Sequence, residues 1–262
     1  MSETNSPDGP NPIFPDLKDQ IVFITGGGSG IGAEFTRAFA AQGARIGFVS
    51  LRRRTANRLC EEIEVAGQHR PLFIPCDVRD IDALRQAMAE IRSDLGPITV
   101  LINNAARDTR HQLASTTVDE WDNAINTNLR PYFFTVQAAQ KDMAELGRGS
   151  VINLGSNSSI LGLTGYPAYV ASKAAIVGMT KALARELGTC CIRVNALLPG
   201  WVLTDRQKDL WLTDQALREC LEQQCLKTTV TEKDVANAAM FLASTASGMI
   251  TGQTLVIDGG RV

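Results

Sequence analysis

The sequence predicts an α/β protein with a doubly wound, parallel sheet of seven strands and helices on both faces. Short apolar segments of strand character alternate with longer segments of helical character along almost the whole chain. Regular alternation of this kind builds parallel strands joined by right-handed crossovers. The strand segments are apolar at successive positions, as in residues 22–24 and 100–102, which is typical of strands covered by helices on both sides.

The expected elements of the N-terminal half come in strand–helix pairs. A strand over residues 20–25 precedes a helix over 30–42, a strand over 44–50 precedes a helix over 55–66, and a strand over 70–75 precedes a helix over 81–92. Each strand segment is a short apolar run, and each helical segment is longer and more polar.

The C-terminal half continues the pattern with longer helical segments. A strand over 98–103 is followed by one long helix within 118–146, and a strand over 150–156 by a helix over 167–187. A strand over 192–198 leads into a polar helical stretch from 204 to about 225, and a helix over 232–244 precedes a last strand over 254–257. Seven strands account for almost the whole chain, so we expect one domain over residues 16–262.

The overall composition is that of a globular protein. Of 262 residues, 44% are hydrophobic and 21% are charged, and the formal net charge is −2, so no basic excess is present to bind nucleic acid. No apolar run approaches the roughly 18 residues of a membrane-spanning helix. The proline-rich residues 1–15 lack the regions of a secretory signal, and we expect them to form a flexible tail.

The cysteines and histidines form no metal-binding pattern. None of the six cysteines stands in a C-x-x-C pair, and only two histidines are present, so we expect no metal site. Cysteines spread thinly over a chain of this length are typical of the reduced thiols of a cytoplasmic protein.

A glycine-rich segment between the first strand and the first helix predicts a dinucleotide site. Its sequence, over residues 25–32, is TGGGSGIG. Glycines let the backbone turn sharply and approach a pyrophosphate, whose charge is stabilised by the free N–H groups at the helix start. Alone, such a cluster could form any tight turn, but its place directly after a strand and before a helix favours a dinucleotide.

The end of the second strand favours NADP over NAD. The usual dinucleotide fingerprint places an acidic residue here to bind the ribose hydroxyls, but this chain has Ser50, Leu51 and Arg52, followed by Arg53 and Arg54. Guanidinium groups bind a 2′-phosphate well. Alternatively, these arginines are only solvated and the cofactor is NAD.

Two residues four apart in the helix over 167–187 predict an acid–base group. Tyr169 and Lys173 share one helix face, and a neighbouring cation lowers the pKa of a phenol from its usual value of about 10 toward the working range. Ser156 ends the preceding strand, where α/β sheets place their ligands, and Asn128 lies in the long helix. Each could instead be an ordinary surface or solvated residue.

Together these motifs resemble the short-chain dehydrogenase/reductase family over nearly the full chain, with the single-domain Rossmann fold that this family has. The resemblance implies a catalytic tetrad of Asn128, Ser156, Tyr169 and Lys173. Tyr169 exchanges the hydroxyl proton, Lys173 lowers its pKa and holds the nicotinamide ribose, Ser156 orients the substrate oxygen, and Asn128 supports a water relay. One departure from the family is Ala106, where the pattern Asn-Asn-Ala-Gly has glycine.

The resemblance also implies which residues bind the cofactor and how the chain assembles. The cofactor-binding residues would be Tyr169 and Lys173 with Gly26, Ser29, Gly30, Ile31, Gly32, Arg52, Asp77, Val78, Asn104, Ala105, Pro199, Gly200, Val202 and Thr204. In this family, helices like the long helix and the 167–187 helix pair across two-fold axes. A homotetramer of D2 symmetry is therefore expected.

Polar loops beside the expected site favour a sugar or polyol substrate. The segments over 107–111 and 201–211 are rich in hydrogen-bonding groups and contain two tryptophans, and they resemble the sugar (aldose) 1-dehydrogenase branch of the family. We expect a substrate lid over about 201–226, and substrate-binding residues Arg110, His111, Asn157, Trp201, Arg206 and Trp211. The alternatives are a reductase of a 3-oxoacyl thioester or other small ketone, and a dinucleotide-binding sensor without catalysis.

Overall fold

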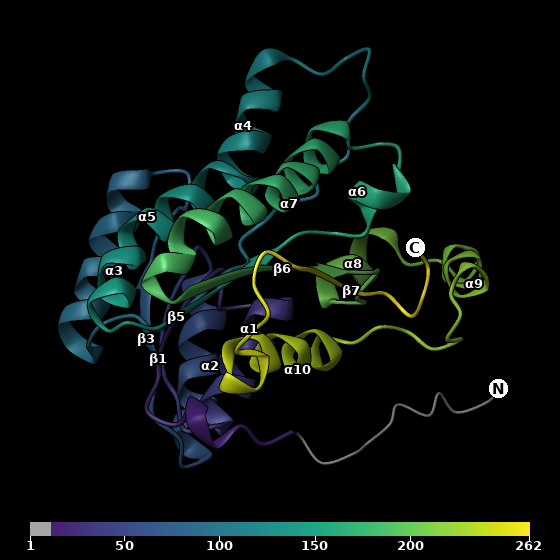
Figure 1. Cartoon of the computed structure of the whole chain (residues 1–262). Helices are drawn as coiled ribbons and strands as arrows, with labels where there is room; N and C mark the ends of the chain where they lie inside the picture. The colour runs from purple at the N-terminus through teal and green to yellow at the C-terminus, as the bar shows by residue number, and fades with distance from the viewer. Residues whose placement is uncertain (1–11) are drawn as a thin grey trace.

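The computed structural model describes residues 12–262, and its core is one seven-stranded parallel sheet of order β3-β2-β1-β4-β5-β6-β7 (Figure 1). The fold class predicted from the sequence is therefore confirmed. The strands are β1 (Ile21–Thr25), β2 (Arg45–Ser50), β3 (Leu72–Pro75), β4 (Val100–Asn103), β5 (Gly149–Leu154), β6 (Ile192–Pro199) and β7 (Thr254–Ile257).

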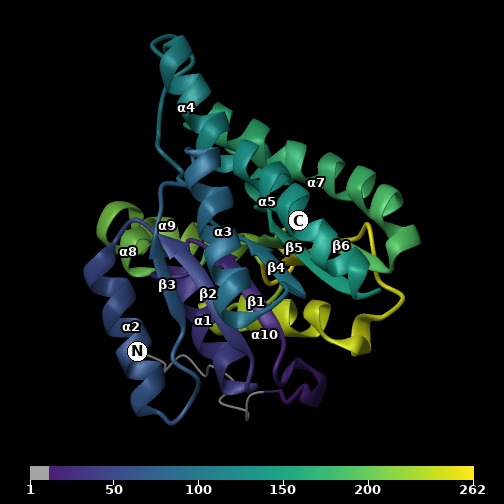
Figure 2. The same ribbon diagram turned by 90° about the vertical axis from the view of Figure 1, so that its left-hand side faces the viewer.

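Helices cover both faces of the sheet and make two separate apolar cores (Figures 1 and 2). Helices α1 (Gly30–Ala41), α2 (Arg53–Val65) and α10 (Glu232–Ala243) pack on one face. Helices α3 (Ile81–Leu95), α5 (Arg130–Glu145) and α7 (Pro167–Leu187) pack on the other. Strands such as β1 and β4 are buried at every position, because each face meets helices.

The long helix expected within 118–146 is two helices, α4 (Val118–Asn128) and α5. Pro131 lies in the first turn of α5, where its missing N–H leaves no bond unmade, whereas in a helix interior it would break the hydrogen-bond ladder. At the junction, Leu129 has φ −130° and ψ −55°. The end of α4 is thereby turned so that Asn128 is fully buried. In both views α4 projects beyond the sheet (Figures 1 and 2).

The polar stretch expected from 204 to about 225 is also divided, into α8 (Asp205–Trp211) and α9 (Asp214–Gln223). Thr204 and Thr213 cap the two helices by accepting hydrogen bonds from backbone N–H groups, which explains why two helix starts occur here. The sequence analysis did not predict the short helix α6 (Ser158–Leu161), and residues 12–262 also form three 3₁₀ turns, over Pro15–Leu17, Gly188–Cys190 and Thr245–Ser247.

The tail predicted over residues 1–15 falls mostly on residues 1–11, outside the described part of the chain. Within the described part, the side chain of Gln42 accepts a hydrogen bond from the N–H of Phe14 and donates one to the carbonyl of Pro12. None of the helices within residues 12–262 is both long and apolar enough to cross a membrane. In the same residues, no three His, Cys, Asp or Glu side chains are grouped so that they could hold a metal ion.

Candidate active site

A cleft of about 1440 Å³ lies along the carboxyl ends of the strands. Its walls come from the segments that follow β1, β2, β4, β5 and β6 and from α7, α8 and α9. Ligands of open α/β sheets bind at this edge. Ser156, Tyr169 and Lys173 all line the cleft, so the structure brings together three of the four residues expected to act in catalysis.

The turn between β1 and α1 has the geometry of a phosphate-binding loop. Gly26 and Gly30 have φ of +69° and +54°, values that residues with side chains rarely adopt. At Gly32 a Cβ would lie 2.0 Å from the carbonyl oxygen of Gly26, so only glycine fits there. The Ser29 side chain caps none of the amides that begin α1, which leaves these N–H groups facing the cleft for a pyrophosphate. These residues fit the predicted dinucleotide.

Asn104 holds the glycine turn from the neighbouring strand. Its side-chain amide donates to the carbonyls of Thr25 (3.0 Å) and Gly26 (3.2 Å). In return, Thr25 Oγ1 accepts from the backbone N–H groups of Asn104 (2.9 Å) and Ala105 (3.1 Å). Both predicted cofactor residues after β4 therefore line the cleft and fix its floor.

Asp77 and Val78, two of the predicted cofactor-binding residues, follow β3 and line the cleft. The Asp77 carboxylate accepts from the guanidinium of Arg79 and from its backbone N–H. The side-chain bond from Arg79 is the main reason that the pKa of Asp77 is lowered. The carboxylate is thus ionised and fixed in the cleft.

Three arginines line the cleft where the 2′ position of an adenosine ribose is expected: Arg37, Arg52 and Arg58. Of these three, the sequence analysis named only Arg52, and the two arginines that it named after Arg52, Arg53 and Arg54, are absent from the cleft lining. Arg37 and Arg58 both bind the carboxylate of Glu62, at 3.2 and 2.8 Å. The side chain of Ser50 faces the glycine turn, because a Cβ at Gly28 would lie 2.9 Å from Ser50 Oγ.

Tyr169 and Ser156 meet at the centre of the cleft. Tyr169 lies in the first turn of α7, and its phenol interacts with the side chain of Ser156, which follows β5. Burial raises the pKa of the Tyr169 phenol, where the sequence predicted a lowered one, and the charge of Asp108 raises it further. The interaction with Ser156 and the cation of Arg110 act in the opposite direction. Ser156 Oγ is itself held, by bonds from the N–H (3.2 Å) and the hydroxyl (2.8 Å) of Ser158.

Lys173 lies one turn further along α7 and is almost completely buried, with 1% of its surface exposed. Its Nζ donates to the carbonyl of Leu154 (2.6 Å) and to the hydroxyl of Tyr132 (3.1 Å), and it lies 5.6 Å from the ring centroid of Tyr169. Burial lowers the pKa of Lys173 to about 7, so its charge depends on pH near neutrality. Tyr132 was not expected here, and nothing in its sequence surroundings distinguishes it from an ordinary core residue.

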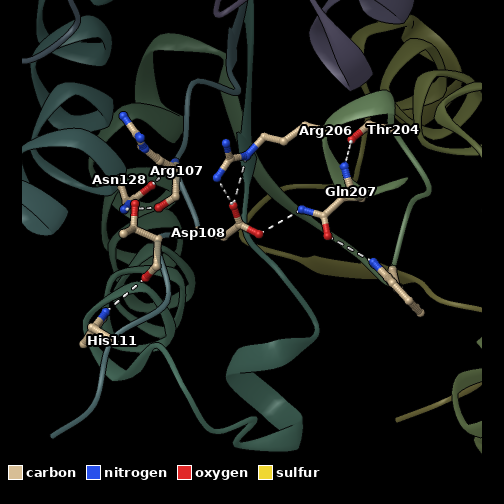
Figure 3. Close-up of polar contacts among 9 residues, drawn as sticks. Arg107, Asp108, His111, Asn128, Thr204, Arg206 and Gln207 are labelled. Atoms are coloured by element: carbon tan, nitrogen blue, oxygen red, sulfur yellow. Dashed lines mark hydrogen bonds and ion pairs between the residues drawn. The ribbon is translucent and has the colours of Figure 1, made fainter. Parts of the chain in front are cut away.

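Asn128, the last residue of α4, is fully buried. Its amide oxygen accepts from the N–H of Arg107 (2.7 Å), and its amide nitrogen donates to the carbonyl of Arg107 (3.1 Å). The oxygen and the nitrogen of this amide therefore both bind the backbone of the loop after β4 (Figure 3). The structure shows Asn128 shaping this loop, and the water relay toward Lys173 stays a proposal.

At the end of the cleft that is expected to bind substrate, polar contacts join the loop after β4 to the segment 201–211, which the sequence predicts to be part of a substrate lid (Figure 3). The Asp108 carboxylate binds the guanidinium of Arg206 at 3.1 Å and accepts from the side chain of Gln207 at 2.8 Å. Gln207 in turn accepts from the indole N–H of Trp201 at 3.0 Å. Of these residues, Asp108 and Gln207 were not among the residues expected to bind substrate, because their pairing spans about a hundred residues of sequence.

Arg110 is held between two aromatic rings at the same end. Its guanidinium carbon lies 3.7 Å from the ring centroid of Tyr166 and 4.9 Å from that of Trp211. Cations lie favourably over aromatic faces in this way. The buried indole N–H of Trp211 has no acceptor among the described residues.

Two of the residues that the sequence predicts to bind substrate have side chains that contact other groups of the protein. His111 is absent from the cleft lining, because its Nε2 accepts from the N–H of Ala168 and its Nδ1 lies 3.0 Å from the carbonyl of Thr109. The structure therefore gives His111 a role in fixing the loop at the start of α7. Asn157 lines the cleft but is buried, and its amide donates to Asp258 at 3.1 Å.

The remaining expected cofactor residues follow β6. Pro199, Gly200, Val202 and Thr204 all line the cleft. At Gly200 a Cβ would lie 2.7 Å from the Cβ of Asp258, so the chain passes here without a side chain. The hydroxyl of Thr204 accepts from the N–H of Gln207, which makes it the cap of α8.

Comparison with known proteins gives dehydrogenases and reductases that match nearly the whole chain. A family profile described as Enoyl-(Acyl carrier protein) reductase matches residues 26–261. The chain is 44% identical over 251 residues to the "Probable galactose dehydrogenase" of Rhizobium meliloti, covering 96% of this chain and 98% of that protein. It is 43% identical over 249 residues to D-xylose 1-dehydrogenase of Caulobacter vibrioides, covering 95% and 98%.

Solved structures agree with this relationship. A 3-oxoacyl-(acyl-carrier protein) reductase from Brucella melitensis has a TM-score of 0.90, 31% identity and full coverage of both chains. A second one from the same organism, solved with bound NAD, has a TM-score of 0.86 and 31% identity, covering 100% of this chain and 98% of that one. The chain thus belongs to the short-chain dehydrogenase/reductase family, as an oxidoreductase that acts on CH–OH groups with a nicotinamide cofactor.

Proposed function

We propose that this protein is a sugar dehydrogenase of the aldose 1-dehydrogenase type, which oxidises the anomeric hydroxyl of a sugar to give a lactone. The observation that carries the proposal is the polar substrate end of the cleft, where Asp108, Arg206, Gln207 and Trp201 form one hydrogen-bonded network beside Tyr169. A polyhydroxylated substrate needs many donors and acceptors and an aromatic face. The two sugar dehydrogenases among the relatives support the same substrate class.

The proposed roles follow from the positions of the side chains. Tyr169 takes the proton of the substrate hydroxyl during oxidation, and the neighbouring Ser156 orients the substrate oxygen. Lys173 supplies a buried amine on the same helix face, which carries a positive charge at and below a pH of about 7. Asn128 fixes the loop after β4 and supports the water relay. When bound, the nicotinamide supplies hydride transfer. The glycine turn over 26–32, with Asn104, Ala105, Asp77 and the segment 199–204, holds the cofactor.

An activity panel tests this proposal. Pentoses, hexoses, deoxy sugars and sugar alcohols are each incubated with NADP and with NAD, and the absorbance of the reduced cofactor is followed. We expect at least one aldose to be oxidised. The competing function is reduction of a 3-oxoacyl thioester, which the two similar reductases from Brucella melitensis favour. Reduction of an acetoacetyl thioester, with no activity on any sugar or polyol, would replace our proposal by that one.

We further propose that NADP is used at least as well as NAD, because Ser50 stands where an acidic residue would bind the ribose and Arg52 lines the cleft nearby. Ser50→Asp is expected to shift the NADP/NAD ratio of kcat/KM toward NAD at least about tenfold, since a carboxylate repels the 2′-phosphate and accepts from free ribose hydroxyls. Steady-state kinetics with both cofactors measure the ratio. Ser50→Asn, of equal size without the charge, is the control. A strong NAD preference of the unmodified protein would mean that the arginines are merely solvated.

We also propose a homotetramer of D2 symmetry. Apolar side chains on α4 and α5 are unusually exposed, with Trp121 at 42% and Phe133 at 44%, and burial in an interface would stabilise them. Light scattering at micromolar concentration is expected to give four times the 28.3 kDa mass of one chain. Phe133→Asp is expected to lower that mass. A monomer of the unmodified protein would contradict the proposal.

A cytoplasmic location is the last part of the proposal. All six cysteines are free thiols, as is usual for proteins of reducing compartments.

A further inference from the structure

Asp108 occupies a special place in the cleft. It belongs to the loop after β4 and lines the cleft together with Ser156 and Tyr169, and 15% of its side chain is exposed. The neighbouring Arg107 is gripped through its backbone by the buried Asn128. Asn128 therefore fixes the backbone of the loop that carries the carboxylate, and a site that recognises a ligand requires such a fixed position.

The Asp108 carboxylate is charged and has acceptor capacity left. Burial opposes its ionisation, but hydrogen bonds from Gln207 and Arg206 outweigh burial, so the pKa of Asp108 is lowered. These two residues make three bonds to it, at 2.8, 3.1 and 3.4 Å (Figure 3). A carboxylate offers about four acceptor positions. The exposed part of the group can thus accept from a ligand without giving up the contacts to the lid.

Closing the lid does not by itself explain a charge at this position. Together with burial, the charge of Asp108 raises the pKa of Tyr169, so it disfavours the phenolate that oxidation requires. A neutral side chain such as asparagine could bind Arg206 without this effect. Binding of the substrate by the Asp108 carboxylate would explain why a charged group lies beside Tyr169 at this position.

We propose that Asp108 determines substrate specificity by accepting a hydrogen bond from a sugar hydroxyl next to the carbon that is oxidised. This inference rests on the proposed function. A bond from a hydroxyl to a carboxylate is charge-assisted and strong. A substrate without that hydroxyl leaves a desolvated carboxylate unpaired, and sites built to bind a hydroxyl reject such analogues strongly. Asp108 thereby selects neutral polyols over ligands that are apolar or anionic beside the reacting carbon.

The test pairs a substitution in the protein with deletions in the substrate. The best aldose of the activity panel and its 2-deoxy, 3-deoxy and 4-deoxy analogues are assayed with the unmodified protein and with Asp108→Asn. The unmodified protein is expected to prefer the parent sugar over the 2-deoxy analogue at least about tenfold in kcat/KM. In Asp108→Asn this preference is expected to fall below about threefold, while the preferences over the 3-deoxy and 4-deoxy analogues stay unchanged. The KM of the parent sugar should rise while the KM of the cofactor stays unchanged.

Two further variants separate substrate binding from lid closure. Gln207→Leu breaks a bond between lid and loop but keeps the carboxylate, so the preference between parent and deoxy sugars should survive. Asp119→Asn removes an exposed carboxylate of α4, outside the main cleft, and should leave all constants unchanged. An equal loss in Asp108→Asn for the parent and every deoxy sugar would overturn the inference and leave Asp108 a residue of the lid. Failure of the proposed function looks different, because no sugar would then be oxidised even by the unmodified protein.

Discussion

Replacing Tyr169 by phenylalanine is expected to lower turnover at least about a hundredfold, the scale of general acid–base catalysis, while cofactor binding is retained. The change keeps the ring, which packs 5.3 Å from that of Tyr166, and removes the phenol hydroxyl that interacts with Ser156. Turnover is measured by absorbance, and the dissociation constant of the reduced cofactor by fluorescence titration.

Tyr166→Phe is the matched control for this prediction. It removes a hydroxyl from the adjacent ring in the same cleft, and we expect a loss of less than about tenfold, below the usual range for a general acid or base. Near-normal turnover of Tyr169→Phe would show that another group exchanges the proton.

Lys173→Met is expected to lower turnover about as much as Tyr169→Phe does. It is also expected to change how the stability of the folded protein depends on pH. The substitution removes the buried amine from the helix face of Tyr169, and with it the positive charge that this amine carries at and below a pH of about 7, so we expect a loss of at least about a hundredfold in kcat at pH 7. Methionine has a similar length and no charge to desolvate. It leaves the carbonyl of Leu154 and the hydroxyl of Tyr132 without the hydrogen bonds that Lys173 makes. This loss lowers the free energy of unfolding by an amount that does not depend on pH.

The pH dependence follows from the pKa of Lys173, which burial lowers from 10.5 to about 7. Between these two values the unfolded chain binds the proton and the folded chain does not, so the unmodified protein becomes less stable as pH falls from about 10 to 7 and levels off below. Lys173→Met has no lysine to titrate at this position, so it does not lose this stability as pH falls. Between about pH 10 and pH 7, its free energy of unfolding relative to that of the unmodified protein is therefore expected to rise, as pH falls, by an amount on the order of a few kcal/mol.

Denaturant unfolding at pH 7 and pH 10 measures this difference, with Lys181→Met, an exposed lysine of the same helix, as the control. Lys181→Met should show neither the loss of turnover nor the change with pH. If the stability difference between Lys173→Met and the unmodified protein were equal at the two pH values, the burial of a titrating lysine would be refuted.

The fold and the cofactor turn can be predicted because the signals are local. The strands are short runs of consecutive apolar residues. In the turn between β1 and α1, Gly26 and Gly30 have positive φ, and a side chain at Gly32 would clash with the carbonyl of Gly26, so the need for glycine arises within the turn itself. Tyr169 and Lys173 lie one helical turn apart, so their shared face also follows from the sequence.

The features that were missed depend on contacts between distant segments. Asp108 meets Arg206 across 98 residues, and Tyr132 meets Lys173 across 41, so no pattern within either segment marks them. His111 is polar and lies in the expected loop, but its ring is bonded to backbone groups that only the fold brings near. The break between α4 and α5 is different, since Pro131 was a local signal and an interior proline is incompatible with one continuous helix.

The most direct test of the account is to follow the hydrogen that leaves the sugar. D-xylose or D-galactose labelled with deuterium at C1 is incubated with the protein and NADP or NAD, and the reduced cofactor and the sugar product are examined by mass spectrometry. We predict one deuterium in the reduced nicotinamide for each lactone formed, and at least about a hundredfold less labelled cofactor when Tyr169→Phe replaces the unmodified protein at matched enzyme concentration and short times. Reduced cofactor free of deuterium, or no oxidation of either sugar together with ready reduction of a 3-oxoacyl thioester, would contradict the assignment as an aldose 1-dehydrogenase.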